Sequence, residues 1–207
     1  MKANIGMSAL QRHPHHQGGA SLIMVMIVLT IVSIIGVAGI QISLMSERGA
    51  RNDRDQQIAW QSAEAALLDA EIDIYGPGPS TRRAIFTPAT NLLAFADGCG
   101  TSGSSIGLCS LVTSGRPTWL TAAFDFSATG SSAPSAFYGK YTGRTPFQTG
   151  GVGTQPAQLP RYVIEPIRDL ADRDLGSPNP TYLYRVTAMG FGPRSDIQAV
   201  LQMIYRN

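Results

Sequence analysis

The stretch QGGASLIMVMIVLTIVSIIGVAGI, residues 17–40, decides the fold. From Ala20 to Ile40 it holds 21 residues without an acidic or basic side chain, and the next charge is that of Glu47. A helix of this length reaches about 31 Å, which matches the hydrocarbon core of a bilayer. The sequence therefore predicts a transmembrane segment, residues 20–45. A cleaved secretory signal is the alternative, but the apolar region of such a signal is only roughly 7–15 residues long.

The polar residues before this run, 1–19, form a candidate leader. Their only formal charges are those of Lys2 and Arg12, which indicates that this end lies on the cytoplasmic side. A glycine pair stands directly before Ala20, and this junction resembles the class III leader of type IV pilins, which a prepilin peptidase cuts after a glycine. The resemblance implies cleavage after Gly19 and N-methylation of the new N-terminus at Ala20. The alternative is a glycine pair that merely precedes a membrane helix.

Composition narrows the classes of function. The chain has 207 residues, a formal charge of +2 and three histidines, all of which lie within the candidate leader. Without that leader 14 basic and 14 acidic residues remain, and no histidine. This balance argues against histidine-based catalysis, histidine metal sites and a strongly basic nucleic-acid surface. We therefore expect no enzyme, no cofactor and no nucleic-acid partner.

The helix is expected to continue beyond the membrane to Tyr75, where the sequence Gly-Pro-Gly-Pro at 76–79 stops it. The helix Ala20–Tyr75 would then be about 84 Å long. Its polar half carries two adjoining apolar stripes, one of mixed size and one of alanines. They are Ile58, Ala65, Leu68 and Ile72, and then Ala59, Ala63, Ala66 and Ala70.

Small residues also recur along the helix, at alternating spacings of three and four. They are Gly36, Gly39, Ser43, Ser46 and Ala50. Such a seam permits close approach of two helices where hydrophobicity does not distinguish lipid from protein. We expect Gly36, Gly39 and Ser43 to take part in subunit docking; the alternative is that these small residues are incidental.

Two further stretches carry a family resemblance: AEAALLDAE at 63–71 and YLYRVTAMGFGPRSDIQAVLQMIYRN at 182–207. Together with the leader and the apolar helix, they resemble the PilX family of type IV pilus minor pilins. The resemblance covers residues 17–75 and 161–207. It implies an α+β pilin-like fold, in which the long N-terminal helix packs on an antiparallel β-sheet head formed by residues 76–207.

The resemblance also implies partners and a location. The partners would be other minor pilins, the major pilin, the prepilin peptidase and the inner-membrane assembly platform. The protein would be a single-pass inner-membrane protein before assembly and part of the pilus on the cell surface afterwards. Pili of this kind serve cell adhesion and twitching motility.

One position departs from the pilin pattern. Most pilins have a glutamate at the fifth mature position, where this chain has Met24. That carboxylate is thought to meet the terminal amine of a neighbouring subunit, and it is costly in a membrane when unpaired. Its absence predicts a subunit that primes assembly and lies at or near the fibre tip. The rival interpretations are a type II secretion pseudopilin of the tip-capping kind, which usually carries a large inserted helical domain, and a membrane-anchored adhesin.

The head is expected to contain loops first and strands later. Residues 76–160 are rich in small and turn-forming residues, with a short helix expected near Thr90–Phe95. The expected aromatic anchors are Trp119, Phe124, Phe126, Phe137 and Tyr138. The expected strands are Arg161–Ile167, Tyr182–Met189 and Ile197–Tyr205, with residues 190–193 as a hairpin connection.

Three features of the head bear on chemistry. Cys99 and Cys109 should form a disulfide in an oxidising periplasm, which would stabilise the fold by roughly 2.5–3 kcal/mol. Asp169, Asp172 and Asp174 form either a calcium site or a solvated loop. The head carries 11 basic and 7 acidic residues, whereas residues 47–75 carry 3 basic and 7 acidic ones. These opposite balances favour helix–head packing or contacts between subunits, unless both are simply solvated faces.

Overall fold

The computed structural model describes residues 20–78, 80–121, 133–145, 154–170 and 180–206. Its first element is helix α1, Ala20–Ile74, which runs through 55 residues without a break. The prediction of one long helix is therefore confirmed, with its end one residue earlier than expected. The chain divides into two compact units, and the boundary between Gly49 and Ala50 falls within α1.

The C-terminal end of α1 is set by a glycine. Gly76 has a φ of 84°, and its N–H donates a hydrogen bond to the carbonyl of Ile72 at 2.9 Å. A left-handed residue just past the last turn is the usual way to satisfy the final carbonyls of a helix. Pro77 then follows, and its ring prevents the helix from continuing.

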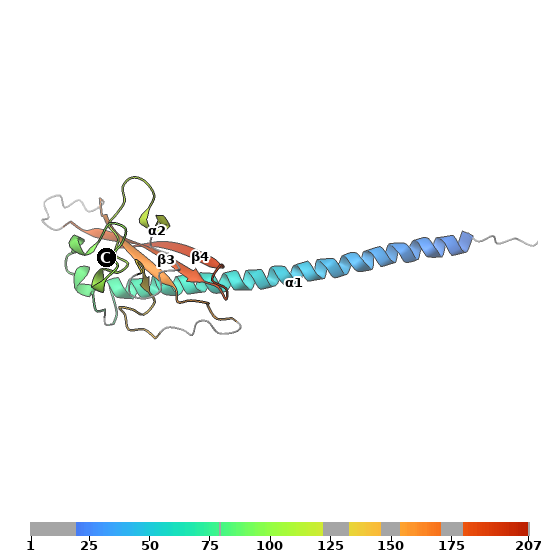
Figure 1. Cartoon of the computed structure of the whole chain (residues 1–207), viewed down its shortest axis with the longest axis horizontal. Coiled ribbons are helices and arrows are strands. Elements are labelled where there is room, and N and C mark those ends of the chain that lie inside the picture. Colours follow the sequence, from blue (N-terminus) through green and yellow to red (C-terminus); the bar gives the residue numbers. More distant parts are fainter. Residues whose placement is uncertain (1–19, 79, 122–132, 146–153, 171–179, 207) are drawn as a thin grey trace, which may run out of the picture. The chain divides into compact units, whose positions relative to one another are not determined.

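The head contains one antiparallel sheet of four strands in the order β1-β2-β3-β4 (Figure 1). These strands are β1 (Ala136–Phe137), β2 (Arg161–Arg168), β3 (Tyr182–Phe191) and β4 (Gln198–Tyr205). The three predicted strands are confirmed, but the predicted connection at 190–193 is wrong in its first half. Gly190 and Phe191 belong to β3 and pair with Ala199 and Gln198 of β4.

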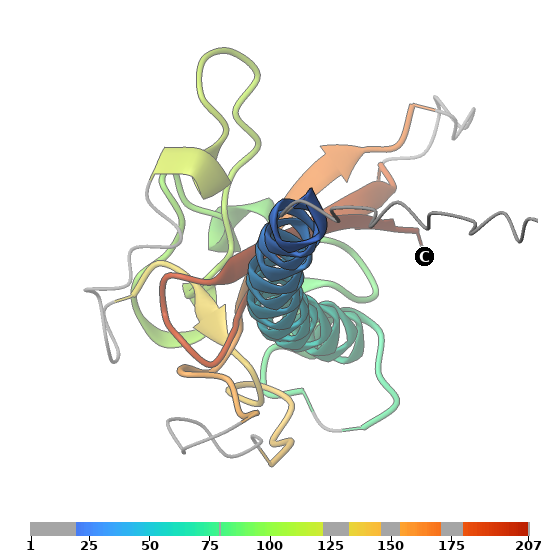
Figure 2. The ribbon, with the colours of Figure 1, turned by 90° about the vertical axis from the view of Figure 1, so that its right-hand side faces the viewer.

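The reason for this longer strand is the contact between β3 and α1. A Cβ atom at Gly190 would lie 2.2 Å from the carbonyl oxygen of Ala59 and 2.2 Å from the amide nitrogen of Ala63. The two backbones therefore touch, and only glycine on the strand and small residues on the helix permit this approach. In both ribbon views the strands lie against the polar half of α1 (Figure 1 and Figure 2).

This contact decides which stripe of α1 is buried. The alanine stripe faces the sheet, and each of its four members is fully buried. The other stripe remains at the edge of the contact, so that Leu68 is 47% exposed. Larger residues on the buried stripe would hold the sheet away from the helix.

The segment between α1 and the sheet consists of loops and single helical turns. The helical pieces are three 3₁₀ turns, Arg83–Ile85, Leu92–Ala94 and Gly103–Ser105, and helix α2, Thr118–Thr121. The turn at Leu92–Ala94 corresponds to the short helix expected nearby. Of the expected aromatic anchors, Trp119 packs on the sheet, while Phe124 and Phe126 lie outside the described residues.

The predicted disulfide between Cys99 and Cys109 is present. Both cysteines are buried and pack with Val163, Met189 and Phe191 of the sheet. The disulfide thus closes a loop directly over one end of the sheet, where the loop covers apolar side chains of β2 and β3.

Candidate functional site

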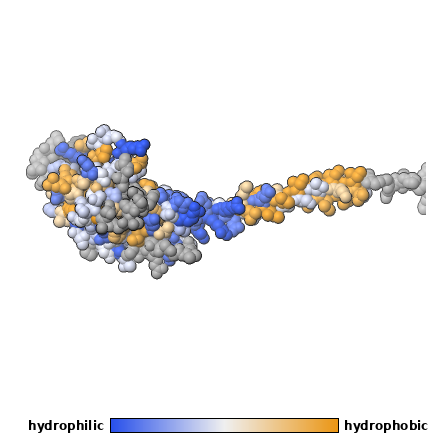
Figure 3. Space-filling view, viewed as in Figure 1, coloured by the Kyte–Doolittle hydropathy of each residue, from blue (hydrophilic) through white to orange (hydrophobic). Residues whose placement is uncertain are grey.

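Helix α1 is apolar in its N-terminal half, which is exposed from Ser21 onward. It is the one helix in the described part of the chain that is long and apolar enough to cross a membrane, with a mean hydropathy of 2.8 over its most apolar window. Figure 3 shows these hydrophobic residues covering the N-terminal part of the helix, followed by hydrophilic residues. This half of α1 fits a single-pass membrane anchor.

Few polar groups interrupt this surface, and two of its hydroxyls are satisfied within the helix. Thr30 donates to the carbonyl of Met26 at 2.8 Å, and Ser33 donates to the carbonyl of Leu29 at 2.7 Å. Hydroxyls bonded in this way carry no unsatisfied donor into the hydrocarbon.

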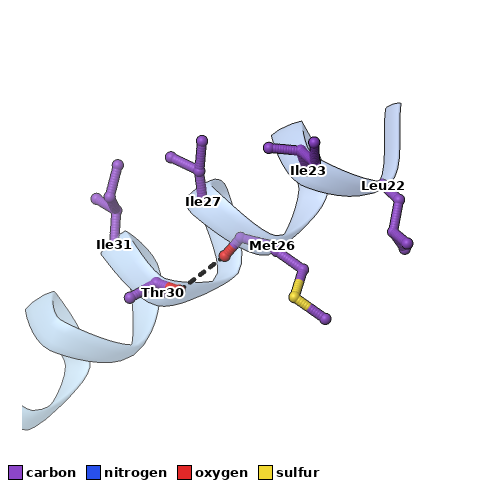
Figure 4. A pocket seen from close by; sticks show the side chains of 6 residues that line it. All are labelled: Leu22, Ile23, Met26, Ile27, Thr30 and Ile31. Atoms are coloured by element: carbon purple, nitrogen blue, oxygen red, sulfur yellow. Dashed lines mark hydrogen bonds between the residues drawn. The ribbon is translucent and has the colours of Figure 1, made fainter. Parts of the chain in front are cut away.

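A shallow apolar groove runs along one face of this segment (Figure 4). Ile23, Ile27 and Ile31 project to one side of it, Leu22 and Met26 project to the other, and Thr30 lies between them. A surface of this kind accepts either acyl chains or the side chains of another helix. It can therefore exchange lipid contacts for protein contacts without exposing apolar groups to water.

The predicted docking residues all lie on α1, but the helix does not bring them into one cluster. The side chain of Met24 is 71% exposed and lines a second apolar groove with Val25 and Val28. Gly36 is twelve residues further along, about 18 Å at the helical rise. A Cβ atom at Gly36 or Gly39 would contact nothing within 4 Å, so both positions are open to an approaching helix. Ala20 is the first residue of α1, and Gly19 lies outside the described residues.

The polar half of α1 carries a second functional feature, a pair of buried aspartates one turn apart. Asp69 accepts a hydrogen bond from the Thr142 hydroxyl at 2.6 Å and one from the Gly139 amide at 2.8 Å. Burial raises the pKa of the Asp69 carboxyl, and these two hydrogen bonds oppose that effect. Asp69 therefore ties the turn that follows β1 to the helix.

Asp73 is the more highly connected of the two. Its Oδ2 accepts hydrogen bonds from the Nε of Arg82 at 2.8 Å and from the hydroxyl of Tyr162 at 3.0 Å. Its Oδ1 accepts one from the Ser80 hydroxyl at 2.8 Å. Asp73 thus joins α1 to the loop after it and to strand β2.

Arg82 extends this network into the disulfide loop. Its Nη1 donates to the carbonyls of Ser104 and Ile106, at 3.1 and 2.6 Å, and its guanidinium stacks 3.7 Å from the ring centroid of Tyr141. Burial is the largest single influence and would lower the pKa of Arg82, but the charge and hydrogen bond of Asp73, together with Tyr162 and Tyr141, raise it on balance. The guanidinium of Arg82 therefore stays charged although neither side chain of the pair is exposed.

Sequence reasoning did not identify this network. The only indication of it in the sequence was the opposite charge balance of the helix and the head, which favoured packing between them. The Asp73–Arg82 ion pair is one such contact between an acidic helix residue and a basic head residue. Arg82 lies in the segment that carried no family resemblance, so nothing in the sequence paired it with Asp73.

The candidate calcium site is only partly described: Asp169 lies 3.4 Å from the Nη2 of Arg206, while Asp172 and Asp174 lie outside the described residues.

Two family models match this chain. The model described as PilX N-terminal matches residues 17–68, and the model described as type IV pilus assembly protein PilX C-term matches residues 105–207. The first match contains the junction of the candidate leader, the apolar helix and the start of the buried stripe. The second contains the disulfide partner Cys109 and the whole sheet. No curated protein and no solved structure matches the chain.

Proposed function

This chain belongs to the PilX family of type IV pilus assembly proteins, and from that membership we propose that it is a minor pilin that primes pilus assembly and lies at or near the fibre tip. The family is a structural component of pilus assembly. The proposal adds two details to that role, the start of assembly by this subunit and its place at the fibre tip. Both depend on the first turns of α1.

Met24 is the observation that carries the proposal. In a pilin with glutamate at this position, the carboxylate needs a partner once it is in the membrane, because an unpaired charge there costs several kcal/mol. The partner is the terminal amine of a neighbouring subunit. Met24 has neither this cost nor this attraction, and its exposed thioether is compatible with lipid or with any apolar helix. A subunit of this kind is suited to start a fibre, where it has no upper neighbour.

The surfaces described above support the remaining steps. Cleavage after Gly19 would free Ala20 for N-methylation. The apolar grooves and the open positions at Gly36 and Gly39 would then allow α1 to leave the lipid for contacts with other pilin helices. The protein would wait in the inner membrane beside the assembly platform and reach the cell surface within the pilus, next to other minor pilins and the major pilin.

The type II secretion pseudopilin of the tip-capping kind is the nearest rival. Such proteins usually carry a large inserted helical domain. In the described part of this head the longest helix is α2, with four residues. This argues for the pilus rather than for the secretion system.

The proposal is tested by deleting the gene and counting fibres by electron microscopy. Because initiation limits the number of fibres and elongation limits their length, the deletion should reduce the number of fibres per cell much more than their length. Expression of the intact protein should restore the number. Fibres of normal number in the deletion strain, or fibres that are fewer and proportionally shorter, would contradict the priming role.

A further inference from the structure

We infer that the free edge of strand β4 binds an extended segment of a different protein, which adds a fifth strand to the sheet of the head. We call this edge the β4 edge and define it by the backbone N–H and C=O groups of Val200, Gln202 and Ile204. The inference goes beyond the proposed function and does not depend on the position of this subunit in the fibre.

The register of the sheet decides which way these backbone groups point. β4 is the last strand in the order β1-β2-β3-β4, so only one of its two edges is paired within the sheet. The N–H of Gly192 donates to the carbonyl of Ile197 at 2.8 Å, which makes these two residues a hydrogen-bonded pair. In an antiparallel ladder such pairs alternate with pairs that exchange no hydrogen bonds. Counted from that pair, Val200, Gln202 and Ile204 fall on the alternate positions, so their backbone groups point away from β3.

Nothing in the described part of the chain closes the β4 edge. Just before it, the carbonyl of Gln198 accepts a hydrogen bond from the side chain of Gln56 on α1 at 3.4 Å. No described group is hydrogen-bonded to the outward N–H and C=O groups of the β4 edge itself. The consecutive residues Gln202, Met203 and Ile204 are all exposed, although neighbouring side chains of a strand project to opposite faces of the sheet. Neither face of β4 is therefore covered at this end of the strand.

The open backbone groups define the kind of partner. Donors and acceptors recur along the edge at every second residue, about 6.8 Å apart. The backbone of another extended chain repeats at the same spacing, so an added strand satisfies the whole row at once. The sequence of β4, QAVLQMIY, has neither a charge nor a proline, which are common means of keeping an edge from pairing. Val200 and Ile204 are 43% and 58% exposed, so the added strand should present apolar side chains beside them.

A second copy of this chain does not fit the β4 edge. Antiparallel pairing of two β4 strands relates the copies by a twofold axis perpendicular to the sheet. This axis also reverses α1, which packs along the sheet, whereas two copies anchored in one membrane by the same end of α1 run in the same direction. Parallel pairing would hold the two α1 helices on opposite faces of the joined sheet, away from each other. The other free edge of the sheet, that of β1, has only two residues. We therefore assign the β4 edge to a different protein.

The test uses the full-length protein in cells that produce pili. A photoreactive benzoylphenylalanine replaces Met203, whose side chain is 47% exposed and whose backbone groups face β3, so the β4 edge stays intact. Irradiation should join this position to a different protein, and mass spectrometry of the cross-linked peptide should locate the adduct in an uncharged segment with alternating apolar residues. The same label at Leu93, a head residue that is 96% exposed, should give no such adduct.

Variants of Ile204 in the Met203-labelled strain test whether the backbone edge holds the partner. Ile204→Pro removes an outward N–H without removing a hydrogen bond to β3, a position at which an edge strand tolerates proline. It should lower the adduct about tenfold, as expected for a lost hydrogen bond and the bulk of the ring. Ile204→Lys keeps the backbone but puts a charge on the exposed apolar face, so it should lower the adduct as well. Ile204→Thr is the matched control, because it keeps the N–H and a β-branched side chain, and most of the adduct should remain.

Thermal unfolding of the purified, unlabelled variants separates the edge from the fold. Ile204→Pro should unfold near the wild-type temperature, whereas Met203→Pro removes a hydrogen bond to β3 and should unfold at a clearly lower temperature. An Ile204→Pro protein as unstable as Met203→Pro would show that the N–H of Ile204 is bonded within the sheet, and the inference would be wrong.

The remaining outcomes are equally decisive. The inference is overturned by an absent adduct, by an adduct that joins a second copy of this chain, or by one that responds to neither Ile204→Pro nor Ile204→Lys. If deletion of the gene lowers fibre number but Met203 yields no adduct, only this inference fails. If deletion leaves fibre number normal but the adduct forms and is lost with Ile204→Pro, only the proposed function fails.

Discussion

The Asp73 carboxylate of α1 and the Arg82 guanidinium of the following loop form an ion pair in which neither side chain is exposed. Removing two charges from water is costly, and this cost is offset only when the remaining hydrogen bonds are also made. Here Asp73 also bonds Ser80 and Tyr162, and Arg82 also bonds two carbonyls. The pair therefore fixes where the head meets the end of the helix.

Breaking this pair from one side should be strongly destabilising. Arg82→Met leaves a buried carboxylate without its cation, so we expect the free energy of unfolding to fall by about 3–5 kcal/mol. The double variant Asp73→Asn with Arg82→Met should lose clearly less than the sum of the two single variants. Denaturant titration of the full chain in detergent measures these values. Arg194→Met, which breaks an exposed pair, is the matched control and should change little. Additive losses in the double variant would contradict the account.

The approach of β3 to α1 gives a second prediction. Gly190→Ala places a methyl group 2.2 Å from backbone atoms of the helix, so strand and helix must separate. We expect a loss of about 3 kcal/mol or more, at the upper end of the usual cost of overpacking. Gly49→Ala is the control, since a Cβ atom there meets nothing within 4 Å, and alanine favours a helix by up to about 1 kcal/mol. Equal stability of the Gly190→Ala protein and the wild type would show that the contact is absent.

Asp69 gives a prediction about pH. Because burial raises the pKa of its carboxyl in the folded state, the folded protein holds this proton at pH values at which the unfolded chain has released it. Protonation of Asp69 therefore contributes fully to the stability of the fold below the ordinary pKa of 3.8. This contribution is lost as the pH rises from 3.8 through the raised pKa of the folded state. Asp69→Asn should remove this part of the pH dependence. Unfolding titrations of both proteins across this acidic range measure the difference, and parallel curves would contradict the assignment.

The leader gives a prediction about processing. Replacing Gly19 with phenylalanine obstructs the extended backbone that a protease must bind, and glycine opposes that conformation least. We expect uncleaved precursor in the membrane fraction, detected by intact mass and by N-terminal sequencing. Gly18→Ala should still be cleaved and should begin at Ala20. Normal cleavage and normal pili in the Gly19→Phe strain would count against the prepilin interpretation.

The sequence predicted the local elements well and the long-range contacts poorly. α1 and strands β2 to β4 follow from uninterrupted periodic stretches bounded by glycine and proline, so their ends were predicted to within two residues. Strand β1 has only two residues, too few for any periodicity, and it exists because β2 offers it an edge.

The buried stripe of α1 illustrates the same difference. Both apolar stripes of α1 have helical spacing. The stripe that contains Ile58, Leu68 and Ile72 has more apolar surface to bury than the alanine stripe. The alanine stripe is buried because the backbone of β3 at Gly190 touches the helix there, a condition that no local pattern reveals. The Asp73–Arg82 pair is likewise a product of the folded loop. In contrast, the exposed apolar surface in the N-terminal half of α1 depends on composition alone, so its residues could be assigned in advance.

The position of the protein in the fibre tests the central claim most directly. Immunogold labelling of intact fibres should place this protein at the ends of wild-type fibres. Met24→Glu restores the carboxylate that docks with a neighbouring terminal amine, so in that strain label should also appear along the shaft. Label distributed evenly along wild-type fibres would contradict the assignment of this protein to the tip.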